Sequence, residues 1–176
     1  MTSYCSVCAE EVVDPVGDVQ NDYLIIEEFP YVIIPPAPQV LKWKKDEWTP
    51  RKIVANELTK VGMVIQQFHI VSVFPHRIPD NGMPNENCYQ VGLENVVTKI
   101  SKYKGVIVLG TNLCKEFTGY DLKSVCGLSG VDSKYIPDGD VPRVFLPSIN
   151  SIFSTGSGEF GIGLRRFAKQ LGVPNG

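Results

Sequence analysis

The sequence predicts an α/β fold, in which helices cover both faces of a mostly parallel sheet in a three-layer α/β/α sandwich. Short apolar segments that read as buried strands alternate along the chain with segments of helical periodicity. The clearest strand, 104–110 (KGVIVLG), is a continuous apolar run, which is typical of a parallel strand covered on both faces. A chain of 176 residues buries one good core, so residues 1–176 are expected to form a single domain.

The remaining strands are predicted from short runs of apolar and β-branched residues. Residues 22–27 read as a buried strand that Pro30 stops, and residues 68–74 are strongly β-prone. Residues 143–147 read as the last strand of the sheet. The loop from 120 to 142 is expected to contain one short strand near 124–129.

Helices are predicted between these strands. In the first of them Pro50 suits the opening turn and Gly62 ends the helix. The proline-rich segment 31–49 is expected to be a long loop, because proline lacks a backbone donor. The predicted helices span 50–62, 86–101, 111–118 and 159–171.

Composition excludes some classes of protein. The 43% hydrophobic residues and the net charge of -2 argue against disorder. Because 19 acidic residues outnumber 17 Lys and Arg, a wholly basic nucleic-acid-binding surface is excluded, but a local basic groove is not. No apolar run approaches the roughly 18 residues of a membrane span, and no signal peptide is recognisable, so a cytoplasmic protein without membrane contact is expected.

The five cysteines point to metal binding rather than to disulfides. Their number is odd and no secretion signal precedes them, which argues against a disulfide framework. Cys5 and Cys8 form a CxxC, whose two thiolates can sit on one tight turn and bind a metal ion or one edge of an iron–sulfur cluster. The alternative is that these cysteines are reduced and purely structural. Cys114 and Cys126 lie in apolar surroundings and are expected in the core.

Several further segments follow the CxxC in a recognisable order. IEEFPY (26–31) stands where a Gly-Glu-Ala-Pro-Gly motif would stand, and VSVFPHR (71–77) is similar to a Thr-Asn-Val-Val-Lys-Cys-Arg-Pro strand. VIVLGT (106–111) and LPSINS (146–151) follow. In this order the chain resembles the uracil-DNA glycosylase superfamily, particularly its iron–sulfur branch, over nearly its whole length.

The resemblance implies a complete set of metal ligands. In the family, further ligands follow the CxxC, and the corresponding positions here are His76 and Cys88. With Cys5 and Cys8 they would tether residues 1–21 to the domain. A set of three cysteines and one histidine suits Zn²⁺ and is a less usual set for a 4Fe–4S cluster, so both cofactors stay open.

The resemblance also implies catalytic positions for N-glycosidic hydrolysis. Glu28 would activate or position the water, Ser72 would contact the base or the water, and Asn150 would donate a hydrogen bond to the departing base. The chain departs from the family pattern here, because Glu27 stands in place of a glycine, Ser72 in place of an asparagine and Asn150 in place of a histidine. A solvated carboxylate that caps the loop is the alternative for Glu28.

DNA contacts are expected after the last strand and on the basic residues. Ile152 and Phe153 would wedge between bases, and Ser154 would bind phosphate without charge. The alternative is that Ile152 and Phe153 begin a buried segment and that the basic residues are ordinary surface. The basic rim would be formed by Lys44, Arg165 and Arg166.

Three functions therefore stay open. The first is a DNA-binding enzyme that excises uracil or a modified pyrimidine. The second is a catalytically degraded binding module that acts with DNA replication or repair proteins, or with another protein partner. A small metal-stabilised structural component is the third alternative. The divergence of the motifs favours a viral or mobile-element origin, in which case the protein would work in the host cytoplasm.

Overall fold

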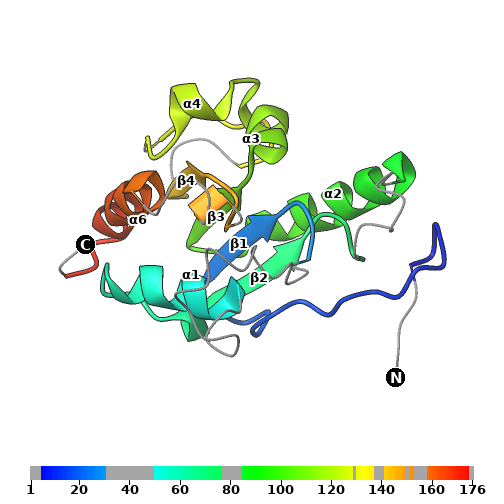
Figure 1. The fold of residues 1–176 in the computed structure, drawn as a ribbon, viewed down its shortest axis with the longest axis horizontal. Coiled ribbons are helices and arrows are strands. Elements are labelled where there is room, and N and C mark those ends of the chain that lie inside the picture. The colour runs from blue at the N-terminus through cyan, green and yellow to red at the C-terminus, as the bar shows by residue number, and fades with distance from the viewer. Residues whose placement is uncertain are drawn as a thin grey trace, which may run out of the picture.

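The fold is a parallel sheet covered on both faces by helices, which confirms the predicted α/β class (Figure 1). The computed structural model describes residues 5–30, 50–76, 85–128, 130–136, 141–149, 151–152 and 158–174. Its four-stranded sheet has the order β2-β1-β3-β4, and every strand pair in it is parallel. The strands are β1 (Tyr23–Glu27), β2 (Phe68–Ser72), β3 (Gly105–Leu109) and β4 (Arg143–Leu146).

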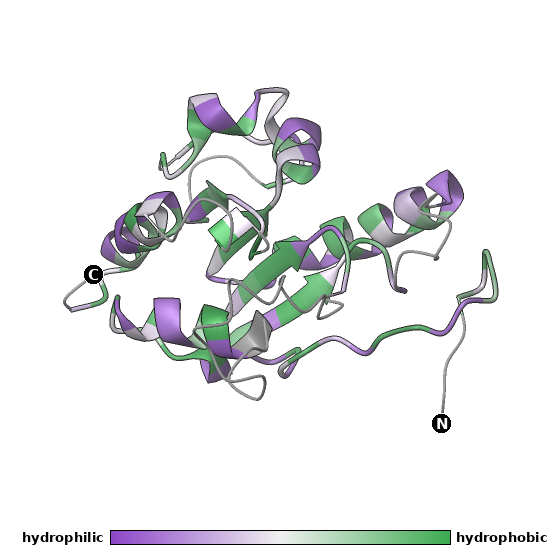
Figure 2. Cartoon of the chain, viewed as in Figure 1, coloured by the Kyte–Doolittle hydropathy of each residue, from purple (hydrophilic) through white to green (hydrophobic). Residues whose placement is uncertain are grey.

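Apolar side chains on both faces of the strands create two cores. Successive side chains of a strand point to opposite faces, so Ile25 and Ile26 enter different cores. One core packs against α2 (Glu86–Ile100), α3 (Thr111–Thr118) and α4 (Leu122–Val125). The other packs against α1 (Pro50–Thr59) and α6 (Gly158–Gln170). Figure 2 shows the hydrophobic colouring concentrated on the strands, with hydrophilic residues on the helices.

The predicted short strand near 124–129 is wrong, because this part of the chain contains the end of helix α4. Leu122 and Val125 have helical spacing and both pack on the core beneath α3, with Val125 5% exposed. The other predicted elements match those observed to within a few residues at their ends.

Helix α2 lies very close to the chain that leaves β2. A Cβ atom on Gly92 would overlap the carbonyl oxygen of Val73, so only glycine permits this approach. The close packing fixes the first turn of α2, which carries Cys88, relative to the carboxyl end of β2.

The N-terminal segment covers the outer edge of β2. Val16 and Ile70 exchange two backbone hydrogen bonds, of 2.7 and 3.0 Å, in an antiparallel bridge. Further along, the N–H of Val13 donates to Pro75 O at 2.8 Å, and Val12 pairs with His76. The segment thus satisfies backbone groups that a sheet edge would otherwise expose.

None of the helices in the described ranges is both long enough and apolar enough to cross a membrane.

Candidate metal centre and sheet-edge site

The CxxC forms a tight turn at the start of the described chain. The N–H of Ala9 donates to Cys5 O at 2.9 Å, and the N–H of Cys5 donates to Glu10 O at 2.8 Å. Ala9 closes the turn with a φ of 61°, in the left-handed region that side chains rarely adopt. This turn brings the thiols of Cys5 and Cys8 to the same side, as the sequence predicts.

The two remaining ligands come from the far end of β2 and from α2. His76 lies where the chain leaves β2 and is held there by its bridge to Val12. Cys88 is the third residue of α2, whose N-terminus Asn85 caps by accepting from the N–H of Asn87 at 2.9 Å. A helix N-terminus stabilises negative charge, which acts against the burial that disfavours a thiolate at Cys88. All four residues predicted as metal ligands therefore meet.

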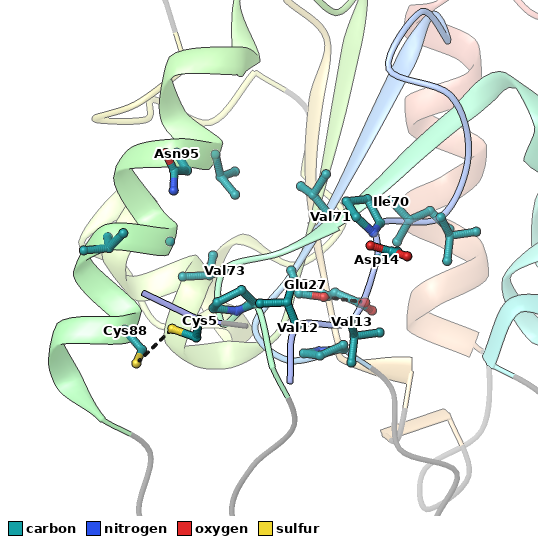
Figure 3. A pocket seen from close by; sticks show the side chains of 18 of the residues that line it. Cys5, Val12, Val13, Asp14, Glu27, Ile70, Val71, Val73, Cys88 and Asn95 are labelled. Carbon is teal, nitrogen blue, oxygen red and sulfur yellow. Dashed lines mark hydrogen bonds between the residues drawn. The ribbon is translucent and has the colours of Figure 1, made fainter. Parts of the chain in front are cut away.

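The ligand atoms converge on one point. The Sγ atoms of Cys5 and Cys88 are 3.8 Å apart (Figure 3), and Cys8 Sγ lies 3.3 Å from His76 Nε2. All four ligand atoms lie within 4.8 Å of one another. Around one tetrahedral Zn²⁺ with Zn–S bonds of about 2.3 Å, neighbouring sulfurs are about 3.8 Å apart.

A 4Fe–4S cluster imposes a different arrangement. Each of its protein ligands binds a different iron, so the ligand atoms stand around a four-iron core and lie further apart than the ligands of a single ion. The convergence at Cys5, Cys8, His76 and Cys88 is therefore the arrangement expected of a mononuclear site.

The protonation of the thiols depends on their surroundings. Burial raises the pKa of the Cys88 thiol to about 12, with contributions from its contacts with Cys8 and Cys5. Burial also acts against the Cys5 thiolate, but hydrogen bonds from the backbone of Val7 and Cys8 lower its pKa overall. Grouped thiols of this kind become thiolates together when a bound cation compensates their charge.

An apolar shell surrounds the four ligands. Cys5, Phe74 and Cys88 belong to one buried cluster, and Phe29 stacks on Phe74 with ring centroids 4.4 Å apart. His76 is 2% exposed. Four protein ligands are typical of a structural metal site rather than of a catalytic one, which keeps a position open for water.

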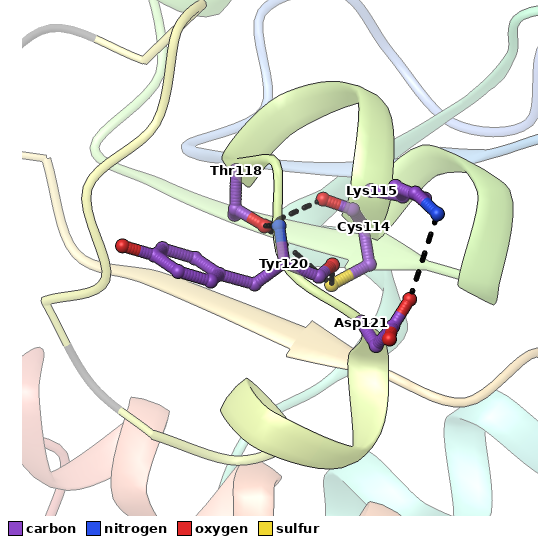
Figure 4. Close-up of polar contacts among 5 residues, drawn as sticks. All are labelled: Cys114, Lys115, Thr118, Tyr120 and Asp121. Atoms are coloured by element: carbon purple, nitrogen blue, oxygen red, sulfur yellow. Dashed lines mark hydrogen bonds and ion pairs between the residues drawn. The ribbon is translucent and has the colours of Figure 1, made fainter.

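The other two cysteines lie outside this centre, as predicted. Cys114 is buried in α3, and its Sγ donates to Tyr120 O at 3.7 Å while Thr118 Oγ1 donates to Cys114 O at 2.8 Å (Figure 4). An ion pair between Lys115 and Asp121 borders this turn. Cys126 is half-buried and its thiol pKa is raised to about 11, chiefly by burial.

A second site lies where the strand order of the sheet reverses. From β1 the chain passes through α1 to β2 on one side, and it returns through α2 to β3 on the other side of β1. In parallel sheets ligands bind outside the carboxyl ends of the strands at such a switch point. Here Asn112, the second residue of α3, donates from Nδ2 to both carboxylate oxygens of Glu28, at 2.9 and 3.2 Å.

Glu27 and Ser72 form a second polar pair, at the carboxyl ends of β1 and β2. Ser72 Oγ donates to Glu27 Oε1 at 2.9 Å. Glu27 is only 7% exposed, because it follows Ile25 on the same face of β1 and points toward the core of α1 and α6. Ser72, which the sequence places in the site, therefore contacts Glu27 rather than Glu28.

Of the remaining predicted site residues, the structure describes Ile152, Arg165 and Arg166. Ile152 is half-buried against the core under α6, which matches the structural alternative for this residue. Arg165 and Arg166 are exposed on α6, and Arg166 Nη1 donates to Gly127 O at 2.8 Å, so its guanidinium is engaged in the fold. The other predicted positions, Lys44, Asn150, Phe153 and Ser154, lie outside the described residues.

His69 is a core histidine. It is 5% exposed, and its Nδ1 lies 2.6 Å from Tyr103 Oη. Its pKa is lowered, chiefly by burial.

Comparison with known proteins gives no family for the chain, because neither a family model nor a curated protein matches it.

Sequence reasoning missed two functional candidates. Asn112 lies two residues after Gly110, the last residue of the predicted strand 104–110, so its place at a strand end was a signal that could have drawn attention to it. Glu27 ends the apolar run Leu24–Ile26, and a carboxyl group in such a run is itself unusual.

Proposed function

We propose that the chain is a DNA-binding protein of the uracil-DNA glycosylase type, which hydrolyses the N-glycosidic bond of uracil or a modified pyrimidine nucleotide. The observation that carries the proposal is the Glu28–Asn112 pair at the switch point of the sheet. The motif order of the sequence supports it, since Glu28 occupies the position of the family's glutamate.

The Glu28 carboxylate is suited to position a water molecule. Two hydrogen bonds from one amide fix its plane, and each carboxylate oxygen retains a further lone pair for a water O–H. In the hydrolysis the water oxygen bonds to the sugar C1′ while the C1′–N bond breaks, the bond electrons go to the base, and the proton lost by the water balances the charge of the base. A carboxylate beside the water stabilises the positive charge that develops on the sugar.

We further propose that Cys5, Cys8, His76 and Cys88 bind one Zn²⁺ ion. The convergence of their ligand atoms within 4.8 Å and the Cys₃His composition support zinc over a 4Fe–4S cluster. The ion would tie the N-terminal segment to the exit of β2 and to α2, so its role is structural. Reduced cysteines and a metal centre suit a protein that works inside a cell.

The activity is tested with oligonucleotides that contain one uracil, in single strands and opposite guanine or adenine. Abasic sites are detected on a gel after alkaline cleavage. Wild-type protein is expected to produce them, and Glu28→Gln is expected to lower the rate about 100-fold or more. Glu94→Gln, on the exposed surface of α2, is the matched control and should cleave like the wild type. Absence of abasic product from uracil and from several modified pyrimidines would refute the enzymatic proposal.

A second candidate function is a binding module that no longer cleaves. The specific observation in its favour is that Glu27, which takes the place of a small residue, pairs with Ser72 and fills space beside the strand ends. Such a module would retain DNA or a replication or repair protein as its partner. It is distinguished by DNA binding at low salt, or by capture of such a partner, without release of base.

A further inference from the structure

A cavity of about 590 Å³ borders the carboxyl ends of β1 and β2. It extends between the N-terminal segment, the edge strand β2 and helix α2, and Figure 3 shows the side chains that line it. Its size is in the range of small-ligand sites. Most of its described lining is apolar, contributed among others by Val12, Val13, Val16, Ile70, Val71 and Val73.

Glu27 is a buried polar group of this lining with unused hydrogen-bonding capacity. Its Oε1 accepts from Ser72, but its Oε2 is shielded from solvent and has no hydrogen-bond partner among the residues that the structure describes. A buried carboxyl oxygen without a partner is costly, so a ligand group that bonds to this atom would be stabilised by it.

The surroundings keep the Glu27 carboxyl group neutral. Burial raises its pKa to about 8, although the hydrogen bond from Ser72 acts in the opposite direction. Along the described lining, the charged groups that could affect Glu27 are Asp14 of the N-terminal segment and Lys99 of α2. The other elements packed around Glu27 contribute apolar groups, Val54 from α1 and Ile149 after β4.

We propose that Glu27 and Ser72 form the specificity-determining end of a binding site for a flat ring that carries a lactam edge, a carbonyl group beside an N–H. That this ring is a nucleotide base rests on the proposed function. Binding of the ring does not require that the protein hydrolyses the glycosidic bond. The motif resemblance assigns base contact to Ser72 but supplies no such role for Glu27, because the family pattern has a glycine where Glu27 stands.

A neutral carboxyl group and a lactam are complementary. The Glu27 Oε2–H would donate to the carbonyl oxygen of the ring, and the second lone pair of Oε1, beside the one that Ser72 occupies, would accept from the ring N–H. The two bonds would satisfy the unpartnered oxygen, while the apolar lining would cover the faces of the ring.

Other ligand chemistries fit this site less well. A cationic amine would take the proton from Glu27 and leave an ion pair in an apolar cavity, which is costly to desolvate. A second carboxylate would repel an ionised Glu27, whereas a lactam ring stays neutral and leaves Glu27 neutral as well.

The test uses the full-length, metal-loaded protein and two small probes, 1-methyluracil and 1,3-dimethyluracil. Both have the same ring, but only the first retains an N–H beside the carbonyl groups. Binding is measured by chemical-shift titration at pH 6.5. We expect 1-methyluracil to bind at least tenfold more tightly than 1,3-dimethyluracil.

Two substitutions at the same position separate recognition from folding. Glu27→Gln presents an N–H donor and a carbonyl acceptor, like the neutral acid, and should bind 1-methyluracil within about threefold of the wild type. Glu27→Leu has a similar size but no polar atom and should lose tenfold or more in affinity. Glu57→Gln, at another buried glutamate that is paired with Lys60, is the control and should bind normally.

Specific outcomes overturn the inference. These are equal binding of the two uracil probes, binding that strengthens as pH rises, or undiminished binding by a folded Glu27→Leu variant. Its failure is distinguishable from failure of the proposed function. Binding of 1-methyluracil without abasic product would leave the inference standing and remove the hydrolysis. Cleavage of uracil-containing DNA that is unaffected by Glu27→Leu would support the proposed hydrolysis and remove the inference about Glu27.

Discussion

The Sγ atoms of Cys5 and Cys88 lie 3.8 Å apart although 83 positions separate the two residues in the chain. With Cys8 and His76 they join the N-terminal turn, the exit of β2 and the first turn of α2 at one point. A metal bound there closes a long loop, so its removal should affect the stability of the whole sheet edge.

The metal centre gives the first prediction. Protein purified without chelator should contain one zinc ion per chain, and Cys88→Ser should remove most of it. Because the binding energy of a structural metal is also folding energy, the midpoint of thermal unfolding should fall by about 10 °C or more. Zinc content is measured by elemental analysis and unfolding by circular dichroism. Cys126→Ser, outside the centre, should retain the zinc. Iron and sulfide in stoichiometric amounts, with visible absorption, would contradict the mononuclear site.

His76 gives the second prediction, which tests ligation rather than packing. His76→Ala should lower zinc affinity about 10- to 100-fold or more, because only three protein ligands remain. Imidazole in the buffer should restore much of that affinity by occupying the vacated position. His69→Ala removes the other histidine, a core residue, and its effect on stability should not respond to imidazole. Zinc affinity is measured by competition with a chromophoric chelator, and a lack of rescue at His76 would argue against ligation by the imidazole.

Glu27 gives the third prediction, a pH dependence of stability. Its pKa is raised from an ordinary 4.5 to about 8, so between these values the folded chain holds a proton that the unfolded chain has lost. The free energy of unfolding therefore falls as pH rises from about 4.5 to about 8, and the contribution levels off above that range. Glu27→Gln cannot ionise, so the variant should become increasingly more stable than the wild type across this window.

Thermal unfolding of both proteins at a series of pH values checks this. The difference between them is the informative quantity, since other groups titrate alike in both. Parallel curves for wild type and Glu27→Gln would show that Glu27 is ionised in the folded protein at neutral pH.

The close approach of α2 to the exit of β2 gives the fourth prediction. Gly92→Ala should destabilise the protein by about 3 kcal/mol, because the added methyl group meets the backbone oxygen of Val73, which cannot move independently of the sheet. Gly158→Ala, in another helix and with open space around its Cβ position, should change stability by less than about 1 kcal/mol. Chemical denaturation measures both, and a similar effect of the two substitutions would contradict the close contact.

The sequence predicts most of the secondary structure because the apolar runs are long and clearly bounded. The run 104–110 reads as a buried parallel strand and is observed as β3, with Gly105–Leu109 all buried. The prediction of a strand at 124–129 is wrong because helix α4, which ends there, has only four residues. So short a segment carries too little periodicity to distinguish a helical turn from a strand. There the packing of Val125 beneath α3 decides the conformation.

The candidate site is only partly readable from the sequence, because it depends on which segments become neighbours. The motif order placed His76 and Cys88 with the CxxC, and the structure brings them together. The partner of Glu28 could not be predicted in the same way, since Asn112 reaches it only through the pairing of β1 with β3. The isolation of Glu27 Oε2 depends on the burial of Glu27, which no local pattern encodes.

The metal centre also constrains the order of events on the ribosome. The thiols of Cys5 and Cys8 emerge first, but the ligand set is complete only after α2 has begun, more than 80 residues later. Until then the N-terminal segment has no complete metal site to anchor it, although β2, the strand that it borders, has already been made. Capture of the proposed zinc ion therefore follows the synthesis of Cys88, and a metal-starved cell should accumulate newly made chains in which this segment is open to proteolysis.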